Sequence, residues 1–220
     1  PMAKPLSEAT GAKIYAFGDH HAGRSAIMKE LSSQGLAGGG EGIDSRFKPD
    51  VILQDGEIIT TNDWTLTALH TPGHIGNHLS LIWGDAVFSG DHVMGWASSL
   101  VSPPDGDLTD FMTSCAKLHA LNSRILYPAH GAPITAPNAR IDWLTNHRLT
   151  REAQVLKALL RGPKTTAKIT SEIYTDIDRA LLAAAERNVF AHLVDLHQRA
   201  KITATPTLST DAKFNPSEEN

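Results

Sequence analysis

Three short segments of the chain present a histidine or an aspartate directly after a turn, in a pattern that could bind a metal ion. The segments read TPGH, SGDH and PAHG, and the candidate ligands that they carry are His74, Asp91 and His130. Imidazole and carboxylate groups suit zinc, and a site with oxygen donors also suits manganese or iron. Taken singly, a histidine beside a turn usually contacts neighbours or solvent, and an aspartate after glycine is usually a turn residue. The three segments in this order are the stronger indication of a metal site.

Each candidate ligand follows a predicted β-strand. Strands are predicted over 64–70, 86–89 and 125–127, and each ends shortly before one of the three ligands. The ends of strands are where α/β sheets build their sites. An amphipathic helix is predicted over 110–121, between the second and third of these strands. This order of strands, helix and strand predicts a layered α/β domain.

Two hairpins are predicted from tight-turn dipeptides. Segments 50–54 and 57–60 flank Asp55-Gly56, and segments 78–83 and 86–89 flank Gly84-Asp85. Dipeptides of this kind between apolar runs favour a tight hairpin. The second predicted hairpin ends at Gly90-Asp91, which makes it the element that positions the carboxylate.

The N-terminal region is predicted to contain two short helices, a short strand and a long glycine-rich loop. A helix is predicted over 2–10, ended by Gly11, and a short strand over 13–17. Residues 18–49 form a glycine-rich loop that encloses a short helix near Ala26 to Leu31. The glycines from Gly38 to Gly42 fit either a flexible lid over the site or a tolerated surface loop.

The C-terminal region has the pattern of a winged helix. Helices are predicted over 138–161, 165–174 and 178–202, followed by a short β segment over 202–208. The polar tail 209–220 is predicted to be disordered. The predicted domains are therefore 1–137, 138–208 and a disordered tail.

Composition limits the classes of function. The chain has 220 residues and a net charge of −4, so no overall basic bias points to nucleic acid. Cys115 is its only cysteine, which excludes a disulfide framework and a thiolate zinc cluster, and its helical position predicts a core residue. No apolar run approaches 18 residues, and the first residues lack the apolar core of a signal peptide. These features lead us to expect a cytoplasmic protein without membrane contacts.

The motifs resemble those of the metallo-β-lactamase fold hydrolases. TPGHIGNH is similar to that superfamily's third metal motif, FSGDHVMG to its aspartate motif, and YPAHG to its last histidine motif. The nearest branch is the β-lactamase-like-protein-2 type, which carries a C-terminal winged helix and includes an endoribonuclease. Residues 50–202 fit that branch in order and spacing, including NHRLTREAQVL at the domain junction. The resemblance implies a partial αββα sandwich followed by a winged-helix domain.

The resemblance also implies a dinuclear zinc site. His74 would bind the first zinc, Asp91 would bridge both metals and His130 would bind the second. Asp91 is thereby also the expected catalytic residue. A bridging hydroxide would attack an ester, amide or phosphodiester bond. His78 is expected to be structural, and His92 either orients Asp91 or lies at the surface.

One motif of the superfamily is absent from the printed sequence. HxHxDH, which supplies four ligands, does not occur, and Asp19-His20-His21 cannot replace it because its spacing differs. His20 and His21 are expected to contact substrate or solvent instead. We therefore expect the chain to be the C-terminal part of a longer hydrolase, with weak or partial zinc binding and little activity of its own. Neither zinc would keep the three protein ligands that a catalytic zinc normally has.

The alternative is a naturally short, non-catalytic pseudoenzyme whose winged helix binds nucleic acid or a protein partner. Its predicted recognition helix is not strongly basic, because acidic residues offset the basic ones: Arg179, Arg187, Arg199 and Lys201 against Asp178, Glu186 and Asp195. The expected partners are a small-molecule ester, thioester or lactam, or RNA, and a homodimer is possible. The tryptophans are expected to be core, except that Trp96, in the loop after Asp91, is the candidate substrate contact.

Overall fold

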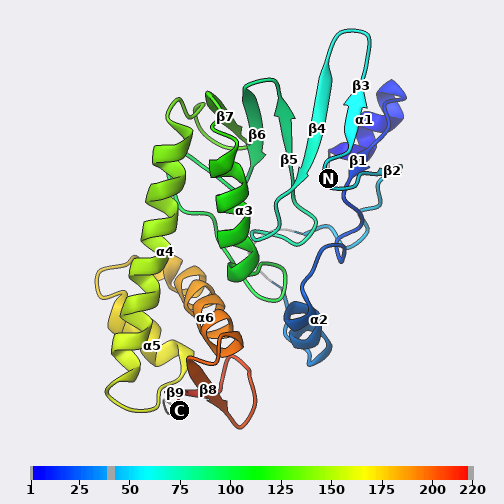
Figure 1. Cartoon of the computed structure of the whole chain (residues 1–220). Helices are drawn as coiled ribbons and strands as arrows, with labels where there is room; N and C mark the ends of the chain where they lie inside the picture. The colour runs from blue at the N-terminus through cyan, green and yellow to red at the C-terminus, as the bar shows by residue number, and fades with distance from the viewer. Residues whose placement is uncertain (1, 39–42, 218–220) are drawn as a thin grey trace.

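The computed structural model describes residues 2–38 and 43–217. Its main feature is a five-stranded sheet with the order β3-β4-β5-β6-β7 (Figure 1). The strands are β3 (Ile58–Thr60), β4 (Thr65–His70), β5 (Leu79–Trp83), β6 (Ala86–Gly90) and β7 (Ile125–Pro128). Neighbouring strands run antiparallel from β3 to β6, and β7 runs parallel to β6. The β5–β6 hairpin is therefore confirmed.

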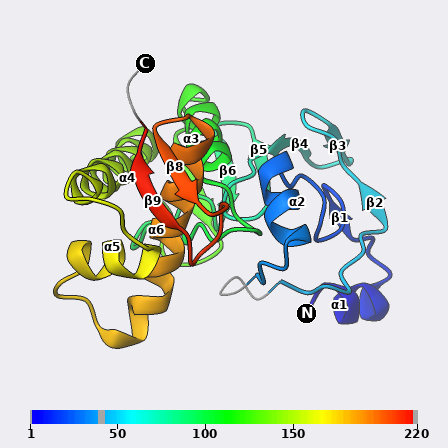
Figure 2. The same cartoon turned by 90° about the horizontal axis from the view of Figure 1, so that it is seen from below.

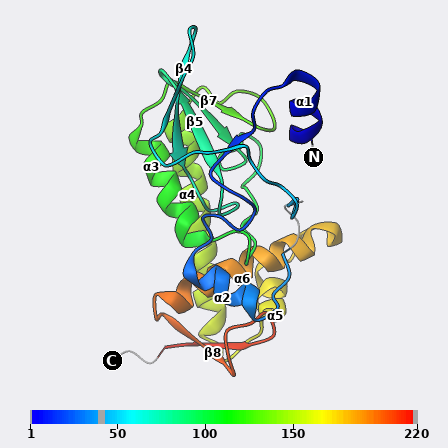
Figure 3. The ribbon, with the colours of Figure 1, turned by 90° about the vertical axis from the view of Figure 1, so that its right-hand side faces the viewer.

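Two helices cover one face of this sheet. The helices α3 (Leu108–Ala120) and α4 (Pro137–Leu159) lie on that side, and α1 (Ala3–Thr10) lies on the other (Figure 3). Val87 and Leu126 of the sheet share a buried cluster with Phe111 of α3 and Leu144 of α4. Burying a side chain as large as Phe111 contributes roughly 2 kcal/mol or more. This cluster fixes the sheet ends that carry the candidate ligands.

The opposite face of the sheet is only partly covered. Trp83 and Phe88 stack with ring centroids 6.4 Å apart, and Phe88 and Tyr127 lie 5.6 Å apart. Trp83 is 51% exposed and Phe88 is 39% exposed. A row of three aromatic rings with two of them exposed is unusual for a sheet whose other face is well packed.

The predicted hairpin between 50–54 and 57–60 is wrong. Strand β2 (Val51–Ile52) pairs in parallel with β1 (Tyr15–Ala16) in a separate two-stranded sheet, and β3 pairs with β4. The turn at Asp55 lies between β2 and β3 and so connects the two sheets. Its carboxylate accepts a hydrogen bond from the backbone N–H of His70 at 2.7 Å, which holds the turn against β4. The Asp-Gly dipeptide thus turns the chain from one sheet to the next.

The C-terminal region packs around a second core. It contains α5 (Thr166–Ile173), the short 3₁₀ helix η1 (Arg179–Leu181), α6 (Leu182–Gln198), β8 (Ile202–Thr205) and β9 (Lys213–Pro216). The predicted helices are confirmed, with α6 beginning after η1. The helix α2 (Ala26–Ser33) contributes Met28 and Leu31 to this same core, so the N-terminal region is tied to the C-terminal one (Figure 2).

The predicted disordered tail is wrong for residues 209–217. Strand β9 pairs antiparallel with β8, and Phe214 is fully buried in the second core. Phe214 also exchanges two backbone hydrogen bonds with Lys164, at 3.1 and 2.9 Å. The alternating pattern of one buried aromatic residue among polar ones gave too weak a signal for a strand. Residues 218–220, and Gly39 to Gly42 of the predicted lid, lie outside the described residues. Within the described part of the chain, no helix is both long and apolar enough to cross a membrane.

A buried histidine of α6 should make stability depend on pH. His192 is 2% exposed, neither ring nitrogen has a hydrogen-bond partner in the structure, and burial lowers its pKa to about 3. Between pH 6.5 and 3 the unfolded chain binds a proton at this residue and the folded chain does not. The free energy of unfolding should therefore fall as the pH falls, by about 2 kcal/mol between pH 7 and 5 from this residue.

Replacing His192 with leucine should remove that part of the pH dependence. Chemical denaturation of wild-type and His192→Leu protein at pH 7 and pH 5 measures it. An equal loss of stability in both proteins would contradict a neutral, buried His192.

Candidate functional site

The three candidate ligands lie at the same end of the main sheet. His74 follows β4, Asp91 follows β6 and His130 follows β7. The Nε2 atom of His130 lies 3.6 Å from Oδ1 of Asp91. His74 and Asp91 both line a cavity of about 1140 Å³, which is bounded by residues of α1, β1, β3 and β5. The structure therefore brings Asp91 beside His130 and joins it to His74 through one cavity.

The conformation of the His74 loop depends on a close approach to α3. Gly73 has φ +145°, and a Cβ there would lie 2.4 Å from the Cα of Phe111. Two hydrogen bonds hold the loop on the helix: Ser114 Oγ donates to the Pro72 carbonyl at 2.7 Å, and the Asp107 N–H donates to the Gly73 carbonyl at 2.9 Å. Only glycine fits both the backbone conformation and the contact.

The ring of His74 is held in one tautomer. Its Nδ1 lies 2.7 Å from the Leu100 carbonyl oxygen, which can only accept, so Nδ1 carries the proton. Nε2 then keeps its lone pair. A carbonyl behind one ring nitrogen is the usual way in which a protein prepares the other nitrogen for a metal ion.

The carboxylate of Asp91 has an unsatisfied oxygen. Its Oδ1 is buried and accepts no hydrogen bond in the structure. Burying a carboxylate oxygen without a partner is costly, so such an atom usually faces a cation or a polar ligand. The exposed His130 ring is too distant at 3.6 Å for a hydrogen bond.

The neighbouring histidines have other partners. His78 is buried, lines the cavity and has its Nδ1 2.9 Å from Oγ1 of Thr71, and burial lowers its pKa to about 4. His92 is fully buried, so the surface role predicted as one alternative is wrong. Its Nε2 faces Sγ of Cys115 at 3.6 Å and its Nδ1 has no partner, so it does not hydrogen-bond to the Asp91 carboxylate. Cys115 is a core residue as predicted, and burial raises the pKa of its thiol to about 12.

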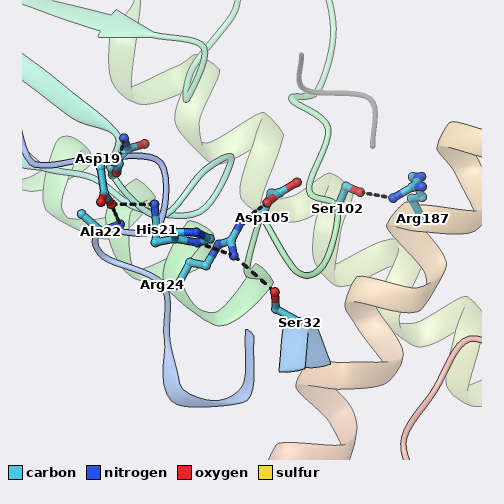
Figure 4. Close-up of polar contacts among 9 residues, drawn as sticks. Asp19, His21, Ala22, Arg24, Ser32, Ser102, Asp105 and Arg187 are labelled. Atoms are coloured by element: carbon cyan, nitrogen blue, oxygen red, sulfur yellow. Dashed lines mark hydrogen bonds and ion pairs between the residues drawn. The ribbon is translucent and has the colours of Figure 1, made fainter. Parts of the chain in front are cut away.

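The segment Asp19-His20-His21 forms a turn near the cavity. The Asp19 carboxylate accepts the backbone N–H groups of His21 and Ala22, which lowers its pKa. His20 lines the cavity, and its Nδ1 is buried without a partner in the structure. His21 instead bonds through Nδ1 to Arg24, which pairs with Asp105 (Figure 4).

The tryptophans are not core residues. Trp64, Trp83, Trp96 and Trp143 are all exposed, so that general prediction is wrong. Trp96 is 72% exposed and lies over Gly131, where an added Cβ would be 3.0 Å from its Cδ1 atom. It therefore flanks His130, as its place in the loop after Asp91 suggested.

The donors fit the chemistry of a metal site but do not complete one. Across residues 2–38 and 43–217, no three His, Cys, Asp or Glu side chains form a group that could hold a metal ion. An imidazole with a free Nε2 and a carboxylate with an unpaired oxygen are suitable ligands, yet a stable site needs more of them together.

Three contacts of the site were not foreseen from sequence. The Leu100 carbonyl faces His74, the Ser99 hydroxyl donates to the carbonyl of Asp91 at 2.5 Å, and Asn188 accepts the N–H of Val101 at 3.3 Å. A backbone carbonyl carries no sequence signal, and Asn188 lies 87 residues from Val101 along the chain.

Comparisons with known proteins agree with this fold. Residues 165–207 match the beta-lactamase associated winged helix domain. A beta-lactamase-like protein 2 homolog of Caenorhabditis elegans is 34% identical over 140 residues, which cover 62% of this chain and 46% of that protein. An atrochrysone carboxyl ACP thioesterase of Aspergillus chevalieri is 36% identical over 116 residues, covering 52% of this chain and 36% of that protein. The chain thus spans less than half the length of either relative.

Structural similarity extends over almost the whole chain. A metallo-beta-lactamase family protein of Thermus thermophilus superimposes with a TM-score of 0.74 at 21% identity, covering 96% of this chain and 74% of that one. That similarity includes both the sheet that carries the ligands and the C-terminal helices. The chain therefore has the metallo-β-lactamase fold followed by a beta-lactamase associated winged helix domain, and its sequence is similar to that of beta-lactamase-like protein 2 homologs.

Proposed function

We propose that this chain supplies part of the site of a metal-dependent hydrolase. The observation that carries the proposal is the buried Oδ1 of Asp91 at the end of β6, which accepts no hydrogen bond and lies 3.6 Å from Nε2 of His130. His74, with its Nε2 free, faces the same cavity. In this proposal His74, Asp91 and His130 would be the residues of this chain that hold the zinc. Bound zinc would supply an activated water for attack on an acyl or phosphoryl centre.

The remaining ligands come, in this proposal, from residues outside the 220 printed here. Two observations support it besides the missing third donor. The aromatic row of Trp83, Phe88 and Tyr127 lies on a sheet face that is only partly covered. The cavity, whose lining includes Ile59, Leu79 and several other apolar side chains, is large enough for additional chain to pack there.

A thioester or a related acyl compound is the substrate class that we favour. The cavity lining has an apolar part, formed by side chains such as Ile59, Leu79 and Leu81, and a charged part that includes Lys4, Arg46 and Lys48. The apolar part suits an acyl chain placed with its reacting carbonyl at the ligands. The thioesterase of Aspergillus chevalieri is consistent with that choice. His20 lines the cavity and Trp96 lies against Gly131, next to His130, and these are the residues that we expect to touch such a substrate.

The second candidate function, nucleic-acid or partner binding by the winged helix, has less support. Nine of the 17 residues of α6 are buried, and two cations on and just after the helix are engaged. Arg187 donates to Oγ of Ser102 at 2.9 Å, and Arg199 pairs with Glu152 and Asp195 at 2.5 and 2.6 Å. A helix packed in this way offers few free cations to phosphate groups.

Zinc binding and hydrolysis, measured in parallel, test the proposed function. The complete natural protein should bind up to two zinc ions tightly and hydrolyse a model thioester, and a chelator should abolish that activity. The 220-residue chain should retain less zinc after dialysis. Hydrolysis by a metal-free complete protein would refute the proposal, and salt-sensitive binding of an oligonucleotide by the same 220-residue chain would support the second function instead.

A further inference from the structure

Four side chains of the C-terminal helices α4 and α6 hydrogen-bond to the loop that follows Asp91. We infer that the C-terminal region positions the candidate metal ligands. Asn188 of α6 is the positioning residue for His74, and Arg148 of α4 is the positioning residue for Asp91. The inference rests on the proposed function, because it assigns those two side chains to the metal site. It gives the winged-helix region a role other than nucleic-acid binding.

A single peptide group connects Asn188 to His74. The peptide between Leu100 and Val101 accepts the Nδ1–H of His74 through its carbonyl at 2.7 Å and donates through its N–H to Oδ1 of Asn188 at 3.3 Å. A peptide unit is planar, with C=O and N–H pointing in opposite directions. Rotating this plane would break both bonds at once, so the side chain of α6 helps to fix the ring of His74.

The orientation of Asn188 is itself fixed by its other bonds. Its Oδ1 also accepts from Nη1 of Arg148 at 2.9 Å, and its Nδ2 donates to the Ala184 carbonyl at 3.1 Å. Two donors therefore face the amide oxygen of Asn188 and one acceptor faces its amide nitrogen, which assigns the two atoms. Oδ1 of Asn188 is thus already oriented to accept the N–H of Val101.

Arg148 extends the same network to Asp91. Its Nη2 donates to the Ser99 carbonyl, and the Ser99 hydroxyl donates to the carbonyls of Asp91 and His92 at 2.5 and 3.0 Å. Arg148 is 3% exposed, and burial lowers its pKa to about 10. No carboxylate pairs with it among the described residues. A buried guanidinium whose acceptors are an amide and a loop carbonyl adds little stability, which favours a role in fixing geometry.

Both ends of the loop are held by the same helices. Arg140 of α4 donates to the carbonyls of Met94 and Ala97, both at 2.7 Å. Arg187 of α6 donates to Ser102 (Figure 4). Four side chains from the C-terminal region thus act on the stretch from Met94 to Ser102, which includes the Leu100 carbonyl that faces His74.

The test is a set of variants of Asn188 in the metal-free protein. Asn188→Ala removes the acceptor, Asn188→Asp keeps it, and Arg151→Ala changes a residue one turn further along α4 that bonds only Gln154 and stacks on Tyr174. Hydrogen exchange of residues 97–102 is compared with that of β5 and β6, which report global unfolding. Two-bond proton–nitrogen spectra of labelled histidine report which nitrogen of His74 is protonated.

In Asn188→Ala we expect exchange in 97–102 to rise about tenfold more than in β5 and β6, and His74 to lose its single Nδ1–H tautomer. Arg151→Ala should behave like wild type, and Asn188→Asp, which keeps the acceptor for Val101 but loses the donor to the Ala184 carbonyl, should retain the Nδ1–H tautomer of His74. If Asn188→Ala fails to fold, Ser99→Ala, which removes one hydroxyl, should show the same local increase in exchange. An unchanged tautomer and unchanged relative exchange in a folded Asn188→Ala or Ser99→Ala protein would overturn the inference. Because no catalysis is measured, this outcome is distinct from failure of the proposed function, which the loss or retention of zinc-dependent hydrolysis decides.

Discussion

Replacing Asp91 with asparagine in the complete natural protein should lower hydrolysis by about 10³-fold or more. The change keeps the size of the side chain and removes the charge that would hold a cation. Oδ1 of Asp91 accepts no hydrogen bond in the structure, and its only neighbour of opposite charge among the described residues is the exposed His130 ring at 3.6 Å, so the folded state loses little there. We therefore expect the free energy of unfolding of metal-free Asp91→Asn protein to stay within about 1 kcal/mol of wild type. Rates on a thioester substrate and denaturation curves measure the two effects.

Replacing either candidate histidine ligand with alanine should lower the rate of hydrolysis as much as Asp91→Asn does, but the two changes should differ in their effect on stability. His130 is exposed, so His130→Ala should not change stability, whereas His74→Ala also removes the hydrogen bond to the Leu100 carbonyl and should cost about 1 kcal/mol. His119→Ala is the matched control, because that exposed histidine of α3 pairs only with Asp142. Full activity in Asp91→Asn, His74→Ala or His130→Ala would show that the assigned ligands are wrong.

The placement of the candidate ligands at strand ends could be predicted because it depends on local chain patterns. Each follows an apolar strand and a turn, and the turn of the β5–β6 hairpin is encoded by Gly84-Asp85. Gly73 is likewise encoded locally, since its backbone conformation excludes other residues. What the sequence could not supply is how close His74, Asp91 and His130 come to one another.

The features that were predicted wrongly depend on pairing between distant segments. An Asp-Gly dipeptide commonly closes a hairpin, but Asp55-Gly56 joins two sheets. The reason is that β2 pairs with β1, in which Tyr15 lies 36 residues before its partner Val51. The loop from Met94 to Ser102 has no local signal for its conformation, and its hydrogen bonds come from Arg148 and Asn188 on two other elements. Such contacts exist only once α4 and α6 have packed.

Phe214 of strand β9 should contribute strongly to stability, although composition alone would place it in a disordered tail. Phe214→Ala should lower the free energy of unfolding by about 3–5 kcal/mol, because it leaves a cavity in the second core. Phe214 is fully buried there together with residues of α5 and α6, and Met28 of α2 belongs to the same cluster. A loss of this size exceeds what a typical surface change produces. Urea denaturation followed by circular dichroism measures it.

The neighbouring residue provides the control that separates packing from strand formation. Lys213 pairs with Thr205 in the same ladder but is exposed, so Lys213→Ala should change stability by less than about 0.5 kcal/mol. Because Met28 and Leu31 connect α2 to the second core, Phe214→Ala should also speed hydrogen exchange in residues 26–33, far away in sequence. Equal stability of Phe214→Ala and Lys213→Ala would mean that β9 does not pack in solution. The second core would then end at β8, and the tail would be disordered after all.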